Sequence, residues 1–295
     1  MSTRAIEKTH LPEWFRVRRH TGARYRTISN LCKQQGLHTV CEEAKCPNIW
    51  ECWNSGTATF MILGRACTRA CTFCGVPMAR HPLPVDPEEP RKVAEALTRL
   101  GLDWAVLTSV TRDDLADSGA SVFAACVEQI HRLQPSCGVE VLIPDFKGET
   151  RALDLVIESG PQVAAHNVET VPRLYSEVRP QADYRRSLEV LDYLSRKSGG
   201  KYVVKSSLMV GLGETEQEIH EVISNLAASG CRAMTLGQYL SPSRKHHPVA
   251  RFYEPDQFDR LADIALTAGI SRVAAGPLVR SSYQAHRLAG RQLHG

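Results

Sequence analysis

The chain has 295 residues, of which 43% are hydrophobic and 23% charged, a composition typical of a globular protein with one large domain. Its 20 glycines and 16 prolines exclude a collagen-like or disordered chain, and a formal net charge of +4 does not indicate nucleic acid as a partner. No apolar run reaches the ~18 residues of a membrane span, and residues 1–19 lack the apolar stretch of a secretory signal. We therefore expect a cytoplasmic protein whose partners include neither nucleic acid nor a membrane.

Residues 1–56 are polar and precede the first predicted strand, so we expect an N-terminal extension there rather than a second domain. From residue 57 onwards, short apolar runs alternate with helical stretches. The predicted strands are 58–63, 105–109, 139–143, 163–167, 202–210 and 233–237. The predicted helices begin near Glu88, Asp117, Thr150, Arg185, Thr215 and Pro255. The clearest helix start is a capping box of Thr215 and Glu218, and Gly230 ends that helix.

These six strand–helix units, with nearly continuous apolar strands, indicate a parallel α/β fold. A closed barrel needs eight such units. A partial barrel and a doubly wound sheet therefore both fit the pattern. In either fold, ligands bind at the carboxyl ends of the strands.

The cysteines are the most informative residues of the chain. Six of the ten fall into two groups of three, C-x4-C-x5-C at Cys41, Cys46 and Cys52, and C-x3-C-x2-C at Cys67, Cys71 and Cys74. Without a secretory signal, such clusters indicate metal binding or catalysis rather than disulfides. A structural zinc site normally has four ligands, whereas three cysteines on a 4Fe–4S cluster leave one iron open to a substrate or cofactor. Two incomplete groups favour two iron–sulfur clusters over zinc.

The position of each cysteine group within the predicted fold suggests its place in the molecule. The second group follows the first strand directly, which puts it at the ligand-binding end of the sheet. We expect the first group, in the N-terminal extension, to pack across this same end of the sheet. The other four cysteines lie in or beside apolar patterns, and we interpret them as buried core residues. They are Cys32, Cys126, Cys137 and Cys231.

The second cysteine group, with Phe73 directly before its last cysteine, resembles the signature of radical S-adenosylmethionine enzymes. The first group, in the segment CEEAKCPNIWECW at 41–53 followed by ATFMILG at 58–64, resembles the lipoyl synthase family within that class. Further matching segments are HNVET at 166–170, KSSLMVGLGET at 205–215, QYLSP at 238–242 and RSSY at 280–283. The resemblance runs from about residue 11 to about residue 285. One departure is Trp50, where the family pattern has a small residue, so the packing beside the first cysteine group is in question.

The resemblance implies a partial (β/α)6 TIM-type barrel over residues 57–278, preceded by the cluster-binding extension 1–56 and followed by a C-terminal tail, 279–295. It implies that the cluster on Cys67, Cys71 and Cys74 binds and reductively cleaves S-adenosylmethionine to a 5′-deoxyadenosyl radical. It further implies an auxiliary 4Fe–4S cluster on Cys41, Cys46, Cys52 and the serine Ser282, with Ser281 as the alternative ligand.

The implied reaction is the radical insertion of two sulfur atoms at carbons 6 and 8 of a protein-bound octanoyl chain. The auxiliary cluster donates the sulfur, and the product is the lipoyl cofactor on a lysine of a carrier domain. The C–H bonds at carbons 6 and 8 are unactivated, so no side-chain acid or base could deprotonate them. This activity is that of a sulfurtransferase of lipoate biosynthesis.

The predicted strand ends suggest which residues surround S-adenosylmethionine. We expect Asn167 and Glu169 at the ribose, and Phe73 beside the adenine, mainly through its backbone. Three residues after the fifth strand would let the backbone approach the cofactor, namely Gly211, Gly213 and Glu214. His166 is interpreted as a hydrogen-bonded core residue. The segment 112–114, Arg-Asp-Asp, is a candidate for the methionyl end.

The expected macromolecular partners also follow from the resemblance. They are an octanoylated lipoyl carrier domain (of a 2-oxoacid dehydrogenase or the glycine cleavage H protein), an electron donor such as ferredoxin or flavodoxin, and an iron–sulfur carrier that rebuilds the spent cluster. Five N-terminal arginines form a candidate docking face, or an ordinary solvated surface, at Arg16, Arg18, Arg19, Arg24 and Arg26.

Three other classes of protein fit the sequence less well. An RNA methylthiotransferase would have a larger cysteine domain first and a basic module after the barrel, and biotin synthase has no N-terminal C-x4-C-x5-C. A simple electron carrier would not need six strand–helix units to shield its clusters.

Overall fold

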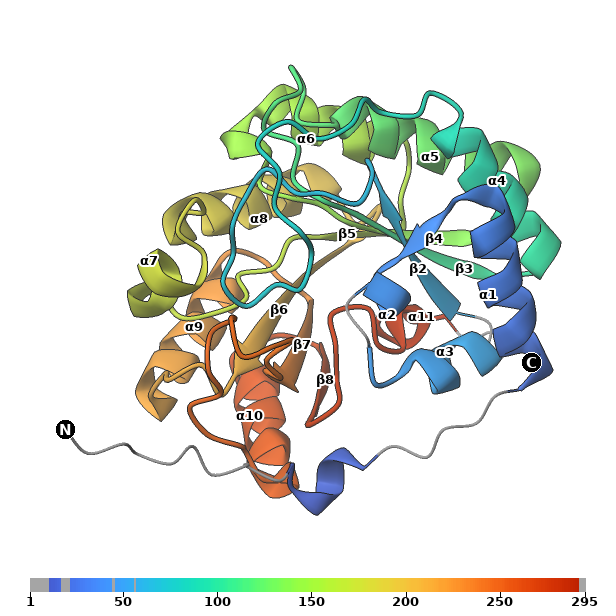
Figure 1. Ribbon diagram of the computed structural model, residues 1–295. Helices are drawn as coiled ribbons and strands as arrows, with labels where there is room; N and C mark the ends of the chain where they lie inside the picture. The colour runs from blue at the N-terminus through green and yellow to red at the C-terminus, as the bar shows by residue number, and fades with distance from the viewer. Residues whose placement is uncertain (1–10, 17–21, 44–45, 56, 292–295) are drawn as a thin grey trace.

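One mixed sheet organises the computed structural model, which describes residues 11–16, 22–43, 46–55 and 57–291 (Figure 1). Its eight strands are hydrogen-bonded in sequence order, from β1 to β8. The two-residue β1 (His38–Thr39) pairs antiparallel with β2 (Thr57–Ile62), and all later pairs are parallel. The other strands are β3 (Trp104–Ser109), β4 (Gly138–Leu142), β5 (Val163–Ala165), β6 (Val203–Val210), β7 (Ala233–Gln238) and β8 (Arg272–Gly276).

This strand order decides between the two folds that the sequence allowed. A doubly wound sheet reverses direction at a switch point, so its strands do not follow one another in sequence order. Here each strand neighbours the next, as in a barrel, and among the described residues no pairing joins β8 to β1 or β2. The partial-barrel prediction is confirmed, and the doubly wound alternative is wrong.

Six helices lie around the outside of the curved sheet (Figure 1). They are α4 (Glu89–Leu100), α5 (Ala120–Leu133), α6 (Thr150–Glu158), α8 (Tyr184–Ser198), α9 (Glu216–Ala228) and α10 (Pro255–Thr267). Each begins within three residues of its predicted start. The capping box is present at α9, where the Thr215 side chain accepts from the Glu218 N–H and the Glu218 side chain accepts from the Thr215 N–H.

The remaining helices are short or lie at the open side of the sheet. The N-terminal ones are the 3-10 helix η1 (Glu13–Phe15), α1 (Ala23–Gln35), α2 (Val40–Glu43) and α3 (Ile49–Asn54). Later in the chain are η2 (Phe146–Gly148), η3 (Pro172–Leu174), α7 (Tyr175–Val178) and α11 (Ala285–Leu288). Among the helices that the structure describes, none combines the length and the apolar character that a bilayer crossing requires.

The two outermost strands, β1 and β8, were not predicted. In β8 every residue is half-buried, and its sequence RVAAG is poor in the β-branched and aromatic side chains that mark strands. Strand β1 ties the N-terminal extension to the edge of the sheet, and α3 packs against α1 and β2. The extension is therefore built onto the side of the barrel beside β2.

The C-terminal tail closes one end of the barrel interior. Ala285 in α11 packs with Trp104 and Val106 of β3 and with Val163 of β5, all of which are buried. Because Trp104 and Val163 begin their strands, this end is opposite to the one at which ligands are expected. The tail therefore returns into the barrel.

Candidate functional site

The loop that carries the second cysteine group starts with a sharp turn after β2. Leu63 and Gly64 both have positive φ angles, 68° and 94°, and a non-glycine residue in this region is strained. Two buried side chains hold the turn, because the Leu63 N–H donates to Glu89 Oε2 at 2.8 Å and Arg112 Nη1 donates to the Leu63 carbonyl at 3.2 Å. The direction in which the cysteine loop leaves the sheet is therefore fixed.

Cys67, Cys71 and Cys74 come together with three of the expected cofactor residues. All three thiols, together with Phe73, Asn167 and Glu169, line one cavity of about 780 Å³ at the carboxyl ends of the strands. Burial raises the pKa of Cys71, and burial followed by the charges of the neighbouring thiols raises the pKa of Cys74 to about 11. Three thiolates repel one another here, so the site favours a cationic metal centre that offsets their charge.

Arg69, between the first two cysteines of this loop, pins the loop to the ends of two neighbouring strands. Its guanidinium donates to both carboxylate oxygens of Asp113, at 2.7 and 3.0 Å, and to Asp145 Oδ1 at 2.6 Å. Asp145 also accepts from Arg186 Nε at 2.8 Å. Burial disfavours the charge on Asp145, but the two guanidinium groups outweigh it and hold the carboxyl pKa well below its usual range.

The segment 112–114 is therefore structural in part. Asp113 binds Arg69, while Arg112 donates to Asp114 at 2.8 Å. None of the three is among the residues that line the 780 Å³ cavity, and their contact with the methionyl group stays a prediction.

The polar side of the cavity is built after β5. Asn167 Nδ2 donates to Glu169 Oε1 at 3.0 Å, and Glu169 has a strained φ of 65°. Burial raises the pKa of the Glu169 carboxyl, against the nearby charge of Arg179. Arg179 also lines the cavity and donates to the Asn167 and Val168 carbonyls at 3.0 Å. His166 is buried and bonded at both ring nitrogens, as expected of a core residue, although it reaches the cavity wall.

The residues that follow β6 form a self-contained turn. Glu214 accepts the Gly211 N–H at 2.6 Å and the Tyr253 hydroxyl at 2.8 Å. Gly211 has a φ of 98°, and a Cβ there would lie 2.6 Å from the Arg251 carbonyl oxygen, which explains the glycine. Gly211, Gly213 and Glu214 are not among the residues that line the cavity. Their expected contact with the cofactor stays a prediction.

The first cysteine group meets the C-terminal tail at the open side of the barrel. Cys41, Cys46 and Cys52 line one small cavity together with Thr57 and Thr59 of β2, and with Arg280 and Ser282 of the tail. Ser281 is not among the lining residues. Four potential ligands thus converge although they are separated by up to 241 positions along the chain.

Hydrogen bonds hold the tail against the N-terminal extension. Asn48, which is buried, donates to the Leu278 carbonyl at 2.5 Å, and the Tyr283 hydroxyl donates to Glu51 Oε1 at 2.9 Å. On the side of the barrel, a Cβ at Gly237 would lie 2.0 Å from the Val279 carbonyl oxygen. Only glycine allows the tail to cross so close to the end of β7.

The donor set of this second cavity fits an iron–sulfur cluster. Burial and the charge of Cys46 raise the pKa of Cys41 to about 11, and burial with the charges of both other thiols raises the pKa of Cys52. Thr57 Oγ1, a buried polar atom beside the thiols, lacks a hydrogen-bond partner in the described part of the chain, and the Trp53 side chain reaches the Cys41 sulfur. Anionic sulfur would satisfy such donors, and a cationic iron core would offset the thiolate repulsion.

A single metal ion fits less well than a cluster. No three Cys, His, Asp or Glu side chains among the described residues are arranged to hold one ion. A four-iron cluster places a separate iron at each ligand, so its thiols stand further apart than those of a zinc site.

Comparison with known sequences decides the family. The family model of the Radical SAM superfamily matches residues 61–226, and the model of the N-terminal domain of lipoyl synthase matches residues 2–46. A lipoyl synthase from Rubrobacter xylanophilus is 53% identical over 93% of this chain and 85% of its own length. One from Caldicellulosiruptor saccharolyticus is 50% identical over 94% of this chain and 97% of its own length.

The chain belongs to the lipoyl synthase family.

Solved structures agree on the fold. Methylornithine synthase superposes with a TM-score of 0.50 at 14% identity, covering 84% of this chain and 76% of its own. Coproporphyrinogen III oxidase from Escherichia coli, a radical SAM enzyme, has a TM-score of 0.51 at 13% identity, covering 72% of this chain and 53% of its own. As a member of the lipoyl synthase family, the chain is a sulfur-inserting radical SAM enzyme whose cofactors are S-adenosylmethionine and two 4Fe–4S clusters.

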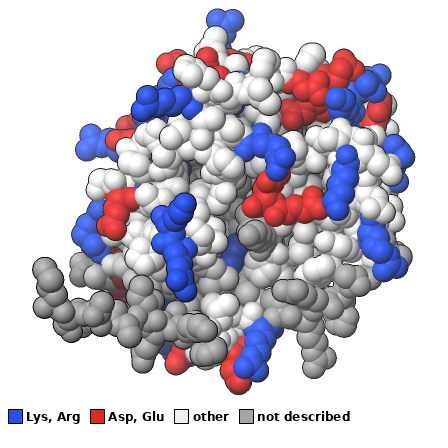
Figure 2. All heavy atoms as spheres, viewed as in Figure 1, with Lys and Arg blue, Asp and Glu red and all other residues white. Residues whose placement is uncertain are grey.

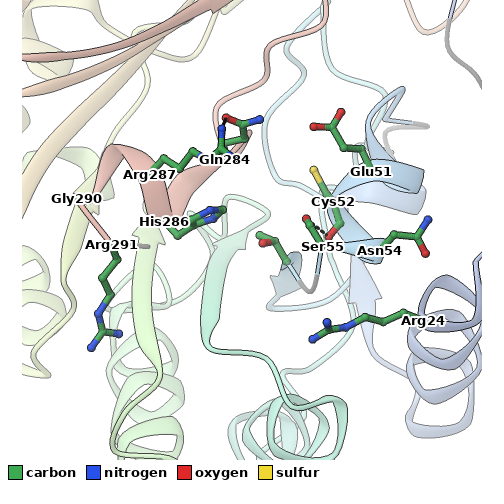
Figure 3. A pocket seen from close by; sticks show the side chains of 11 residues that line it. Arg24, Glu51, Cys52, Asn54, Ser55, Gln284, His286, Arg287, Gly290 and Arg291 are labelled. Atoms are coloured by element: carbon green, nitrogen blue, oxygen red, sulfur yellow. Dashed lines mark hydrogen bonds between the residues drawn. The ribbon is translucent and has the colours of Figure 1, made fainter. Parts of the chain in front are cut away.

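Two further features lie close to the first cysteine group. Trp50 stacks on Tyr25 of α1, with ring centroids 4.3 Å apart, so the large side chain joins α3 to α1. Beyond Cys52 lies a third cavity, of about 880 Å³, between α3 and the tail. In Figure 3, Glu51 and Cys52 project from α3 on one side of it, and Gln284 and Arg287 lie on the other.

Proposed function

We propose that the two cysteine groups divide the work of this lipoyl synthase-family enzyme. Cys67, Cys71 and Cys74 hold the 4Fe–4S cluster that binds S-adenosylmethionine. The auxiliary 4Fe–4S cluster is held by Cys41, Cys46, Cys52 and Ser282. When bound, the first cluster supplies the electron that cleaves S-adenosylmethionine, and the second supplies both sulfur atoms inserted at carbons 6 and 8 of a protein-bound octanoyl chain. The convergence of Ser282 with the first cysteine group in one cavity carries this proposal.

The residues of the main cavity orient the cofactor and exclude water. The Asn167 amide and the Glu169 carboxylate offer a donor and acceptors to the ribose hydroxyls. Phe73 supports the adenine. Apolar side chains, including Val110 and Ile143, also line the cavity and keep other hydrogen donors away from a reactive radical.

Ser282 is the distinctive ligand of the auxiliary site. A serine oxygen is harder than thiolate sulfur and binds iron less well. The iron on Ser282 is therefore the one most easily released, as a cluster that gives up sulfur requires. The lining of the cavity supports Ser282 over Ser281 as the ligand.

We further propose that the substrate is an octanoylated lipoyl carrier domain, of a 2-oxoacid dehydrogenase or the glycine cleavage H protein. Met78 lines the main cavity and is 51% exposed, and Leu83 further along the same loop is 84% exposed, so an apolar rim is available to a docked domain. Cationic and anionic side chains are interspersed on the face shown in Figure 2, so charge alone does not mark the docking site. Of the five N-terminal arginines, Arg18 and Arg19 lie outside the described residues, and Arg16 pairs with Glu13.

The remaining partners and the compartment are part of the same proposal. A ferredoxin or flavodoxin supplies electrons, and an iron–sulfur carrier rebuilds the auxiliary cluster after each turnover. None of the ten cysteines, all of which are described, is paired in a disulfide, which supports a reducing compartment and hence the cytoplasm.

Paired ligand variants test the division of work. Ser282→Ala should keep S-adenosylmethionine cleavage but form almost no lipoyl product, whereas Cys71→Ser should lose cleavage itself. Ser281→Ala is the matched control and should behave as the wild type. Cleavage is measured as 5′-deoxyadenosine and lipoyl formation by mass spectrometry of an octanoylated carrier peptide. Normal lipoyl formation by Ser282→Ala would refute its role as ligand, and cleavage by Cys71→Ser would refute the catalytic assignment.

A further inference from the structure

Arg280 is the one cationic side chain among the residues that line the cavity of the first cysteine group. It is partly buried; burial raises the pKa of Cys46, and the nearby charge of Arg280 opposes that rise. Its Nη1 donates to the Val279 carbonyl at 2.7 Å, which leaves the other guanidinium N–H groups available. Among the described residues no carboxylate lies within ion-pair distance of it.

A guanidinium removed from water without a carboxylate is costly, because its charge loses solvation and gains no partner. The auxiliary cluster expected in this cavity would be the anionic partner of Arg280. Three thiolates and a serine oxygen carry more negative charge than an iron–sulfur core carries positive charge, so the ligated cluster is a net anion. The charge on Arg280 and the charge of the ligand set are therefore complementary.

The backbone fixes the position of this charge. The tail crosses β7 so closely that a Cβ at Gly237 would lie 2.0 Å from the Val279 oxygen and 3.5 Å from Arg280 Nη1. On the other side, Asn48 holds the Leu278 carbonyl at 2.5 Å. The backbone directly before Arg280 is thus held on two sides, one guanidinium nitrogen is bonded to it, and Arg280 lines the cavity that Ser282 also lines.

We propose that Arg280 is a positioning residue that compensates the negative charge of the auxiliary cluster and raises its reduction potential. The inference rests on the proposed function, because it takes the ligand set from there. Reduction adds a negative charge to the cluster, so a nearby fixed cation favours the reduced state. Arg280 suits this task because its charge persists at any physiological pH and its planar fork is rigid.

The test isolates the auxiliary cluster. In a parent chain with Cys67, Cys71 and Cys74 all changed to Ala, only the first cysteine group can hold a cluster. Iron and sulfide content, circular dichroism and a redox titration followed by electron paramagnetic resonance are then compared for Arg280→Gln and Arg280→Lys. Arg287→Gln, at an exposed arginine further along the tail, is the matched control.

In Arg280→Gln the equilibrium constant for reduction should fall at least about tenfold, so the midpoint potential should become more negative by about 59 mV or more for one electron. Arg280→Lys should recover most of the shift, and Arg287→Gln should show none. A cluster in Arg280→Gln with the parent's potential would overturn the inference. If Arg280→Gln binds no cluster, an Arg280→Lys variant that binds the cluster with nearly the parent's potential supports the inference. A folded Arg280→Lys variant that also binds no cluster overturns the inference. A folded parent without any cluster would instead refute the ligand assignment of the proposed function.

Discussion

The buried ion pairs of Arg69 are expected to hold the catalytic cysteine loop in place, and Asp145→Asn tests this directly. The Asp145 side chain is 1% exposed and accepts from Arg69 at 2.6 Å and from Arg186 at 2.8 Å. The variant keeps the shape of the side chain but removes its charge. Arg69, whose side chain is 6% exposed, would then retain Asp113, which is partly exposed, as its one carboxylate partner.

The size of the effect follows from these contacts. Removing one partner of a buried ion pair destabilises a protein by about 3–5 kcal/mol. Because asparagine still offers one acceptor and Asp113 remains, we expect the lower end, about 3 kcal/mol. At roughly 2–4 °C per kcal/mol for a chain of this size, the apoprotein should melt roughly 6–12 °C lower.

The assay combines stability with cluster chemistry. Thermal unfolding of the apoprotein is followed by circular dichroism, and the reconstituted protein is assayed for S-adenosylmethionine cleavage. The control is Asp192→Asn, whose partner Arg196 lies on the same helix and whose side chain is 49% exposed; this variant should melt as the wild type does. If Asp145→Asn melts with the control and cleaves S-adenosylmethionine at the normal rate, the ion pairs do not hold the loop.

Three further predictions concern other parts of the molecule. Lys205 and Glu140, each 1% exposed and 2.7 Å apart inside the barrel, form a buried ion pair. In denaturant titrations, Lys205→Met should therefore lower the free energy of unfolding by about 3–5 kcal/mol, and adding Glu140→Met should recover most of that loss. Equal stability of the single and the double variant would contradict this prediction. Gly237→Ala places a Cβ 2.0 Å from the Val279 oxygen, so it should displace the tail, reduce bound iron by about half and spare S-adenosylmethionine cleavage; full iron content would show that the tail adapts. The pKa of Asp145 is lowered on folding, so its contribution to stability is complete above the unfolded pKa of about 3.9 and is lost as the pH falls towards and through the folded pKa. The difference in melting temperature between the wild type and Asp145→Asn should therefore narrow below about pH 4. A constant difference would refute the cause given for the pKa shift.

The predicted strands and helices of the barrel rest on local signals that the structure confirms. The capping box at Thr215, for example, depends on residues three positions apart, and α9 begins beside it. Strand β8 was missed because its alanines and glycine carry little strand signal, and because its pairing with β7 is a tertiary contact. The predicted strand 163–167 ends at Ala165, where the chain turns towards the strained Glu169.

The site was predictable where its chemistry lies in a short motif. Cys67, Cys71 and Cys74 are within eight positions of one another, and together with the first incomplete cysteine group they favoured iron–sulfur clusters. Arg69 and Arg179 were missed, since their roles depend on loops that meet only in the folded chain, such as Arg69 with Asp145, 76 positions away. A possible signal for Arg69 was its place between two ligands, although an arginine there also fits a solvated loop.

The four other cysteines show the opposite case. Cys32, Cys126, Cys137 and Cys231 were expected to be buried core residues from apolar periodicity, and all four are buried free thiols. Burial raises the pKa of Cys32 to about 12, so the thiol stays protonated and unreactive at neutral pH.

The origin of the inserted sulfur tests the division of work between the two cysteine groups most directly. The apoprotein is reconstituted anaerobically with iron and heavy-isotope sulfide, freed of unbound sulfide, and incubated with S-adenosylmethionine, a reductant and an octanoylated carrier peptide. Mass spectrometry should find heavy isotope at both inserted sulfurs in the intact enzyme, and no lipoyl peptide when Cys41, Cys46 and Cys52 are changed to Ala. Lipoyl peptide formed by that variant, or light sulfur in the product of the intact enzyme, would contradict the account.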